Sequence, residues 1–153
     1  MAKAYFAGGC FWGIEDAFRK VTGVRDALSG YANGKVANPT YEQVCTGTTD
    51  HAETVEVDYD PQQVSYADLI EVFWQLHDPT QWNRQGPDVG TQYRSAIFTL
   101  SAQEATQAQA SKAALDASGR FSRSIVTLIE PLEAFYTAEA YHQRYLERRG
   151  RAH

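Results

Sequence analysis

The sequence lacks the features that define several large classes of protein. Among its 153 residues it has only two cysteines, Cys10 and Cys45, which are too few for a disulfide-stapled secreted scaffold or a cysteine zinc site. No apolar run approaches the roughly 18 residues that a membrane-spanning helix needs. The four histidines are scattered singly, without metal-ligand spacing. These absences favour a cytoplasmic protein with reduced thiols, no metal and no membrane partner.

Charge and motif content exclude further classes. Lysine and arginine number 14 and aspartate and glutamate 19, which gives a formal net charge of −5. This balance argues against nucleic acid or an anionic membrane as a partner. There is no glycine-rich phosphate loop, dinucleotide fingerprint or nucleophile elbow, and no repeat, low-complexity segment or linker. We therefore predict that residues 1–153 form a single domain.

The hydrophobic pattern alternates between short strand-like and longer helix-like segments. Hydrophobic residues make up 43% of the chain and aromatic residues 12%, enough for a sizeable core. Strands are expected at residues 3–7, 24–30, 52–59, 93–100 and 125–129. Helices are expected at residues 10–20 and 137–148, and after the N-caps Thr40, Ser65 and Ser101. A long loop is expected at residues 77–90. The pattern predicts an α+β two-layer sandwich.

Cys10 carries the most chemical information. It follows Gly8 and Gly9, after a predicted strand, and begins a predicted helix. A thiol there faces unpaired backbone N–H groups and the positive end of the helix dipole, and both stabilise a thiolate. The glycines allow another molecule to approach the backbone closely. Cys10 is therefore either a reactive nucleophile or an inert buried cysteine, and its position alone does not decide which.

Glu53 is predicted to point into the core. In the alternating strand it shares a face with Val55, Val57 and Tyr59. Burial disfavours the charged form of a carboxyl group and raises its pKa, which suits a general acid at neutral pH. The competing interpretation is a frayed strand end, with Glu53 in water.

Five other residues are weaker candidates for a functional site. Phe11 and Trp12 directly follow the cysteine and either wall an apolar pocket or pack in the core. Tyr41, Tyr93 and Asp88 lie near predicted turns or the long loop. Taken singly, each of these three is more typical of a surface or half-buried position.

A series of motifs extends over nearly the whole chain, beginning with Gly9-Cys10-Phe11-Trp12-Gly13. The others are Asn38-Pro39-Thr40-Tyr41, Val44-Cys45-Thr46-Gly47, His51-Ala52-Glu53, Phe73-Trp74, His77-Asp78-Pro79, Asn83-Arg84-Gln85-Gly86, Asp88, Gly90-Thr91-Gln92-Tyr93-Arg94-Ser95, Ala138-Glu139, His142-Gln143 and Tyr145-Leu146. In order and spacing this series resembles the peptide methionine sulfoxide reductase A family.

The resemblance implies an α+β sandwich around a mixed sheet, with a ferredoxin-like core. The family's nucleophile falls on Cys10 and its general acid on Glu53. The tyrosines that hydrogen-bond the sulfoxide oxygen fall on Tyr41 and Tyr93. The Cys10 thiolate would attack the sulfoxide sulfur, Glu53 would protonate the oxygen, and Cys10 would become a sulfenic acid.

The resemblance also implies the substrate and the reductant. Phe11 and Trp12 would hold the S-methyl group, and Asp88 would help to bind the substrate or its water network. Pro87 stands where the family often has asparagine before this aspartate. The family reduces the S epimer of methionine sulfoxide, free or in proteins, in antioxidant protein repair. A monomer is expected. It would use no metal or flavin, and its external thiol would be thioredoxin, glutathione with glutaredoxin, or dithiothreitol in vitro.

Cys45 is not expected to take part in the reaction. Many family members carry further cysteines in a glycine-rich C-terminal tail, whereas residues 148–153 end this sequence without one. Cys45 follows a predicted helical turn, where a buried cysteine suits packing. We therefore expect Cys45 to pack rather than to resolve the sulfenic acid, and an external thiol to recycle a one-cysteine enzyme.

Two alternative functions remain distinguishable by experiment. A cysteine hydrolase or acyltransferase would need a histidine base, for which His51 is the available partner, and would give an acyl-enzyme burst. A non-catalytic reader would use Phe11, Trp12 and the tyrosines as an aromatic cage. That reader would bind its ligand unchanged after Cys10→Ser.

Overall fold

The computed structural model describes residues 2–148. The strands of its main sheet are β1 (Ala2–Ala7), β2 (Val24–Ala32), β3 (Ala52–Tyr59), β6 (Ala96–Thr99), β7 (Leu128–Pro131) and β8 (Phe135–Thr137). A separate small sheet pairs β4 (Arg84–Gln85) with β5 (Asp88–Val89). The helices are α1 (Phe11–Arg19), α2 (Tyr41–Cys45), α3 (Tyr66–Leu76), α4 (Ala102–Ala117) and α5 (Tyr145–Arg148), with 3-10 helices η1 (Thr91–Tyr93) and η2 (Ala140–His142).

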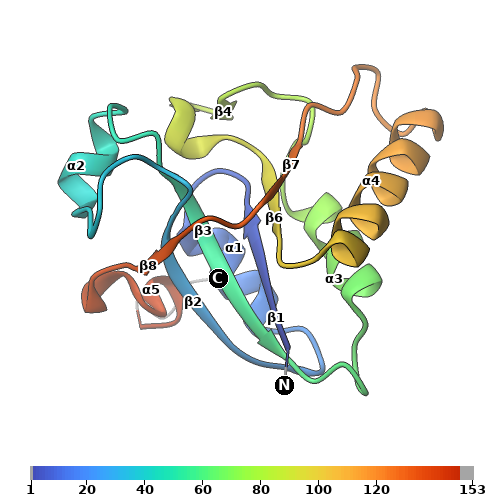
Figure 1. Cartoon of the computed structure of the whole chain (residues 1–153), viewed down its shortest axis with the longest axis horizontal. Helices are drawn as coiled ribbons and strands as arrows, with labels where there is room; N and C mark the ends of the chain where they lie inside the picture. The colour runs from blue at the N-terminus through green and yellow to red at the C-terminus, as the bar shows by residue number, and fades with distance from the viewer. Residues whose placement is uncertain (1, 149–153) are drawn as a thin grey trace.

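The main sheet is mixed and has the strand order β7-β6-β1-β3-β2-β8 (Figure 1). Its four central strands, β6-β1-β3-β2, are antiparallel neighbours. Apart from the short α2 and the segment β4-β5-η1, the elements follow one another along the chain as β1-α1-β2-β3-α3-β6, which is the ferredoxin-like arrangement. After α4, β7 joins parallel to β6, and β8 pairs antiparallel with β2. The predicted α+β fold with a mixed sheet is confirmed.

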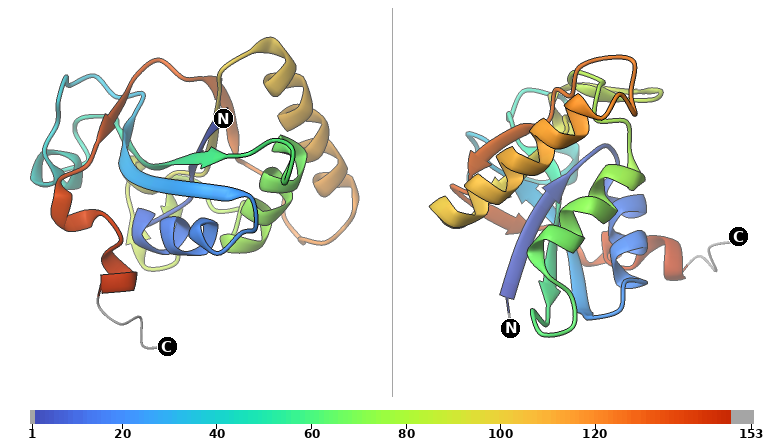
Figure 2. Two further views of the ribbon diagram at one scale, coloured as in Figure 1. Left: turned by 90° about the horizontal axis from the view of Figure 1, so that it is seen from below. Right: turned by 90° about the vertical axis from the view of Figure 1, so that its right-hand side faces the viewer.

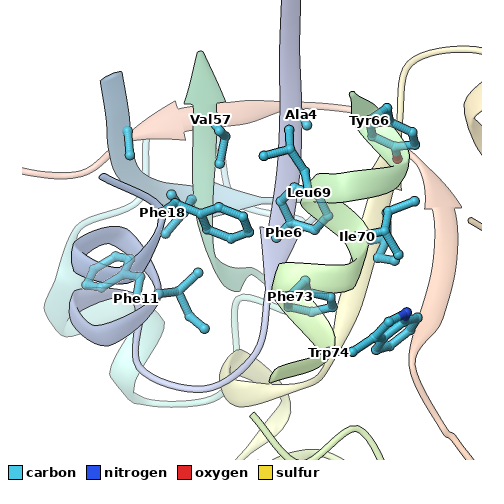
Figure 3. Packing of buried hydrophobic residues seen from close by; sticks show 14 of the residues in the cluster. Ala4, Phe6, Phe11, Phe18, Val57, Tyr66, Leu69, Ile70, Phe73 and Trp74 are labelled. Atoms are coloured by element: carbon cyan, nitrogen blue, oxygen red, sulfur yellow. The ribbon is translucent and has the colours of Figure 1, made fainter. Parts of the chain in front are cut away.

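The main core lies between the sheet and the helices α1 and α3, which pack on the same face (Figure 2). Phe6 from β1 lies between Phe18 of α1 and Phe73 of α3 (Figure 3). Its ring centroid is 5.0 Å from that of Phe18 and 5.1 Å from that of Phe73. The apolar residues that recur at helical spacing in α3 are all buried. α4 packs beside α3 and reaches β6 and β7. Burial of these apolar side chains fixes the position of α1 on the sheet. It therefore also fixes Cys10, the residue that precedes α1.

Side-chain caps begin three of the helices, as the sequence predicts. Thr40 and Ser65 each form a complete capping box, with Gln43 and Asp68 respectively. Ser101 accepts a hydrogen bond from the backbone N–H of Glu104, whose carboxylate binds the N–H of Leu100 instead of closing the box. Among residues 2–148 no helix has both the length and the apolar character to cross a bilayer.

Several strands and helices begin or end at other residues than the sequence predicts. The strand expected at 93–100 occupies only Ala96–Thr99, because Tyr93 ends the 3-10 helix η1. The strand expected at 125–129 lies instead at Leu128–Pro131, where it pairs with β6. The long loop contains the small β4–β5 pair. The helix expected at 10–20 begins at Phe11 and leaves Cys10 as its N-cap.

The closing helix predicted over residues 137–148 is wrong. The segment instead contains the last residue of the edge strand β8, the turn η2 and the four-residue α5. Arg144 has a φ of 55°, which a continuous helix does not accommodate. The side-chain amide of Gln143 exchanges hydrogen bonds with both the N–H and the C=O of Ser29, each at 2.9 Å. Tertiary pairing with β2 thus overrides local helical preference. The last residues of the sequence, 149–153, lie outside the described part.

Candidate active site

Cys10 stands at the junction of β1 and α1, in a loop that packs tightly against the segment 77–85. Gly9 has a φ of 93°, and a Cβ placed on it would lie 2.8 Å from the side chain of Gln85. A Cβ on Gly8 would lie 2.9 Å from the ring of His77. Both positions therefore require glycine, Gly9 also for its left-handed backbone. The loop presents Cys10 as a partly exposed N-cap in extended conformation.

The thiol of Cys10 is not a preformed thiolate. Burial raises its pKa to about 12, the nearby Glu53 carboxylate adds to the increase, and the backbone N–H of Trp12 opposes it. The helix start therefore does favour the thiolate, as expected from the sequence. The expected net stabilisation of a thiolate is nevertheless wrong, because desolvation outweighs a single backbone hydrogen bond.

Glu53 is buried, as the strand alternation predicts, and lies beside the cysteine loop. Its side chain is 2% exposed, and Oε1 accepts a hydrogen bond from the backbone N–H of Phe11 at 3.1 Å. Burial raises the pKa of Glu53 to about 8, against the effect of that N–H and with a further increase from Asp88. Oε2 is buried without a hydrogen-bond partner among the described residues. At pH 7 the carboxyl group is therefore mostly protonated. It is hydrogen-bonded to Phe11, the residue that follows Cys10.

The two tyrosines named from the sequence both lie within electrostatic range of Glu53. Tyr41 begins α2 and Tyr93 ends η1. Burial raises the pKa of Tyr93 to about 12 and that of Tyr41 well above its ordinary value, and the charge of Glu53 contributes to both increases. Both hydroxyls are therefore protonated donors at neutral pH. That of Tyr41 donates to the sulfur of Cys45.

Asp88 belongs to the same cluster. It lies in β5, on the small hairpin next to the cysteine loop. Its negative charge raises the pKa of Cys10, Glu53 and Tyr93. The structure thus brings together side chains from β1–α1, α2, β3, β5 and η1, which lie far apart in the sequence.

The two aromatic residues after the cysteine occupy different environments. Phe11 is 1% exposed and packs in the core (Figure 3), with its ring centroid 5.7 Å from that of Tyr31. Trp12 is only partly buried, and its ring stacks on Tyr145 at 3.7 Å with 8° between the planes. Of the two, Trp12 is the ring that a ligand can reach directly. Phe11 contributes mainly by fixing the start of α1.

Cys45 is exposed, so the expectation that it packs as a buried cysteine is wrong. In the five-residue helix α2 the buried position belongs to Val44, which is fully enclosed. Cys45 lies four residues after Tyr41, on the same helical face, and is close enough to influence the pKa of Cys10. Cys45 directly follows Val44, and adjacent residues of an α-helix point about 100° apart, so Cys45 lies off the buried side. The second thiol therefore lies at the rim of the site.

His51 is not available as a base for the cysteine. It is 1% exposed; its Nδ1 accepts from the N–H of Gly34 at 3.0 Å, and its Nε2 donates to the carbonyl of Val36 at 2.6 Å. Both ring nitrogens thus bind backbone that leads to α2. The arrangement does not favour the hydrolase alternative, which needs a free imidazole next to the thiol.

The C-terminal segment contributes neighbours to which the sequence assigned no role. Glu139 accepts from the hydroxyl of Tyr31 at 2.8 Å and from the backbone N–H of Tyr41 at 2.9 Å. His142 accepts from the indole N–H of Trp12 at 3.1 Å. The only signal for them in the sequence is their place in the motif series. Within residues 2–148, no three histidine, cysteine or carboxylate side chains are grouped so as to hold a metal ion.

Comparison with known proteins agrees with this arrangement. The family model described as peptide methionine sulfoxide reductase matches residues 2–153. The peptide methionine sulfoxide reductase MsrA of Methanothermobacter thermautotrophicus is 59% identical over 149 residues, which cover 97% of this chain and 88% of that protein.

Solved structures give the same result for the fold. The reduced form of Mxr1 from Saccharomyces cerevisiae has a TM-score of 0.92 at 38% identity and covers 99% of this chain and 87% of its own. Mxr1 from the same organism in complex with Trx2 has a TM-score of 0.66 at 28% identity. The match covers 94% of this chain and 84% of the Mxr1 chain. Because the family model and the sequence identity both extend over almost the whole chain, this chain belongs to the peptide methionine sulfoxide reductase family.

Proposed function

We propose that this chain reduces the S epimer of methionine sulfoxide, free or in oxidised proteins, with Cys10 as nucleophile and Glu53 as general acid. The observation that carries the proposal is the buried Glu53 carboxyl group. It is neutral at pH 7 and is bonded to the backbone N–H next to Cys10. A neutral carboxyl can donate a proton to the sulfoxide oxygen, which makes the sulfur more electrophilic.

Cys10, Glu53 and the substrate together account for every proton, oxygen atom and electron in the proposed reaction. The sulfur of Cys10 forms a bond to the substrate sulfur while Glu53 passes its proton to the oxygen. The thiol proton returns to Glu53, the oxygen moves to Cys10 as a sulfenic acid, and the sulfide leaves as methionine. The substrate sulfur is thereby reduced by two electrons and the cysteine sulfur oxidised by two. Because burial raises the pKa of the Cys10 thiol, the thiol is proposed to lose its proton during the attack rather than before it.

The tyrosines and Asp88 complete the proposed site. Tyr93 and Tyr41 are protonated donors, and rotation of the Tyr41 O–H from Cys45 toward the substrate would add a second hydrogen bond to the oxygen. Trp12 would contact the S-methyl group, backed by Phe11. Asp88 would hold the substrate or its water network through the charge that already acts on Cys10 and Glu53.

Stereoselectivity tests the function most directly. The purified chain, incubated with dithiothreitol and either S- or R-methionine sulfoxide, should release methionine from the S epimer and essentially none from the R epimer. The reason is that, with the S-methyl group against Trp12, Glu53 and the tyrosines would reach the oxygen of one epimer only. Methionine is measured by chromatography. Equal rates for both epimers would contradict the proposed geometry, and no release from either would contradict the activity.

An external thiol is proposed to regenerate Cys10. The Mxr1–Trx2 complex supports thioredoxin, because the two proteins are crystallised together; glutathione with glutaredoxin is the alternative donor. Attack of a second thiol on the sulfenic acid forms a disulfide and releases water. Cys45 is exposed at the rim, its sulfur interacts with the Tyr41 hydroxyl, and we assign it no part in the regeneration.

Cys45→Ser should therefore keep most of its steady-state activity with dithiothreitol or with glutathione and glutaredoxin. Wild-type protein given sulfoxide and no reductant should release about one methionine per chain, because the sulfenic acid then waits for a thiol. Mass spectrometry of that sample should find Cys45 as a free thiol. A Cys10–Cys45 disulfide there would make Cys45 the resolving residue.

A further inference from the structure

His142 lies at the centre of the aromatic side chains around the proposed site. It is fully buried at the end of η2. Its ring centroid is 4.3 Å from that of Tyr41, 5.2 Å from Phe11 and 5.7 Å from Trp12. Its Nδ1 accepts a hydrogen bond from the indole N–H of Trp12, across 130 positions of sequence. None of the steps proposed above uses this residue.

Packing alone does not explain a histidine at this position. Because Nδ1 accepts from Trp12, the proton of the neutral ring lies on Nε2. Nε2 is buried and has no hydrogen-bond partner among the described residues. A buried N–H without a partner is unfavourable, and leucine would fill the space without leaving one. What histidine supplies and leucine cannot is the acceptor for the indole of Trp12.

Burial also keeps this acceptor available. It lowers the pKa of His142, against the opposing charges of Glu139 and Glu42. The neutral ring therefore predominates near pH 7. A protonated ring would carry a hydrogen on both nitrogens and could not accept from Trp12.

The turn that carries His142 is itself anchored to the sheet. The next residue, Gln143, binds the N–H and C=O of Ser29 in β2. Two residues further on, Tyr145 stacks on one face of the Trp12 ring. The C-terminal segment, which passes beside α1 (Figure 2), therefore holds the indole by its N–H edge and by one face. A partly exposed tryptophan would otherwise rotate among several rotamers.

We propose that His142 is a positioning residue that sets the selectivity of the site for a methyl substituent on the sulfoxide sulfur. Its Nδ1 fixes the indole of Trp12 in the orientation that meets the S-methyl group. This inference rests on the proposed function, because it assigns Trp12 to that group. Loss of the acceptor weakens substrate binding and lets the site tolerate a larger alkyl group, while Cys10 and Glu53 keep their geometry.

A matched pair of substitutions isolates the acceptor. Asparagine and leucine have the same branched shape, but only asparagine places an oxygen near the position of Nδ1. His142→Leu should raise KM for S-methionine sulfoxide about fivefold, the equivalent of one hydrogen bond, with kcat little changed. It should also reduce the preference for the methyl over the ethyl analogue, S-ethionine sulfoxide. His142→Asn should retain a KM close to wild type.

Two controls separate this role from general loss of structure. Ser111→Ala removes the acceptor of another buried indole, that of Trp74 at 2.9 Å, and should leave KM unchanged. In a Trp12→Phe background, His142→Leu and His142→Asn should have equal KM, because no indole N–H remains. Equal KM for the two variants with Trp12 present would overturn the proposal.

A measurement without turnover completes the test and does not depend on the activity. In an NMR spectrum of protein with 15N-labelled tryptophan, the indole N–H signal of Trp12 should move in His142→Leu and return toward its original position in His142→Asn. The signals of Trp74 and Trp82 should stay in place. An unmoved Trp12 signal in the leucine variant would refute the proposal, whereas failure of wild-type enzyme to reduce the sulfoxide would refute only the proposed function.

Discussion

Cys10→Ser should abolish reduction of methionine sulfoxide while the protein remains folded. A serine hydroxyl is not a nucleophile toward sulfoxide sulfur at neutral pH, and an alkoxide could not carry away the oxygen as a sulfenic acid. The site offers no substitute, because Cys45 lies at the rim on a different element. Methionine release with dithiothreitol measures the activity, and circular dichroism measures the fold.

Cys45→Ser is the matched control for this change. It makes the same substitution at the other cysteine and should keep most of the activity. Thermal unfolding of the two variants should resemble that of wild type, because Cys10 and Cys45 are both at least partly exposed. Substantial turnover by Cys10→Ser would remove Cys10 from the role of nucleophile.

Glu53→Gln should slow sulfoxide reduction by about 10²-fold or more, the usual scale for loss of a positioned general acid. Glutamine has nearly the same shape and can still accept from the N–H of Phe11, but it has no acidic proton. The rate is best measured as a single turnover at pH 7, so that regeneration by the external thiol does not limit it. A rate equal to that of wild type would show that Glu53 is not the acid.

The pH dependence of the single-turnover rate provides a second test of the role of Glu53. The active form of Glu53 is the neutral one, and its pKa is raised to about 8. The single-turnover rate of the wild type should therefore fall as pH rises through 8, whereas Glu53→Gln should lack that fall. Glu56→Gln is the matched control, since Glu56 lies on the same strand but bonds the hydroxyl of Tyr5. It should retain both the wild-type rate and the decline above pH 8.

Features that depend on neighbouring residues could be predicted from the sequence. Alternation along residues 52–59 placed Glu53 inside, because successive side chains of a strand point to opposite faces. Helical spacing identified the buried stripe of α3, and the side chains of Thr40 and Ser65 marked two helix starts. The pair Gly8-Gly9 before Cys10 marked the strand-to-helix junction. Each of these patterns acts within a few residues of the chain.

The segment after residue 134 shows where such reasoning stops. Local preference favoured a helix over 137–148, but in the structure Thr137 ends β8, which pairs with β2, and Gln143 forms hydrogen bonds with Ser29. Neither partner is visible within a short window of sequence. His142 and Glu139 could be found only as motif members, because their contacts with Trp12, Tyr31 and Tyr41 join distant parts of the chain.

The sequence by itself therefore determined the α+β class, the position of Cys10 at a helix start and the inward direction of Glu53. Only the tertiary structure decided the protonation of Cys10, the exposure of Cys45 and the fixed orientation of Trp12. The first set follows from backbone periodicity, which repeats every two or 3.6 residues. The second depends on which distant side chains remove water from a group, and desolvation is a property of the packed molecule.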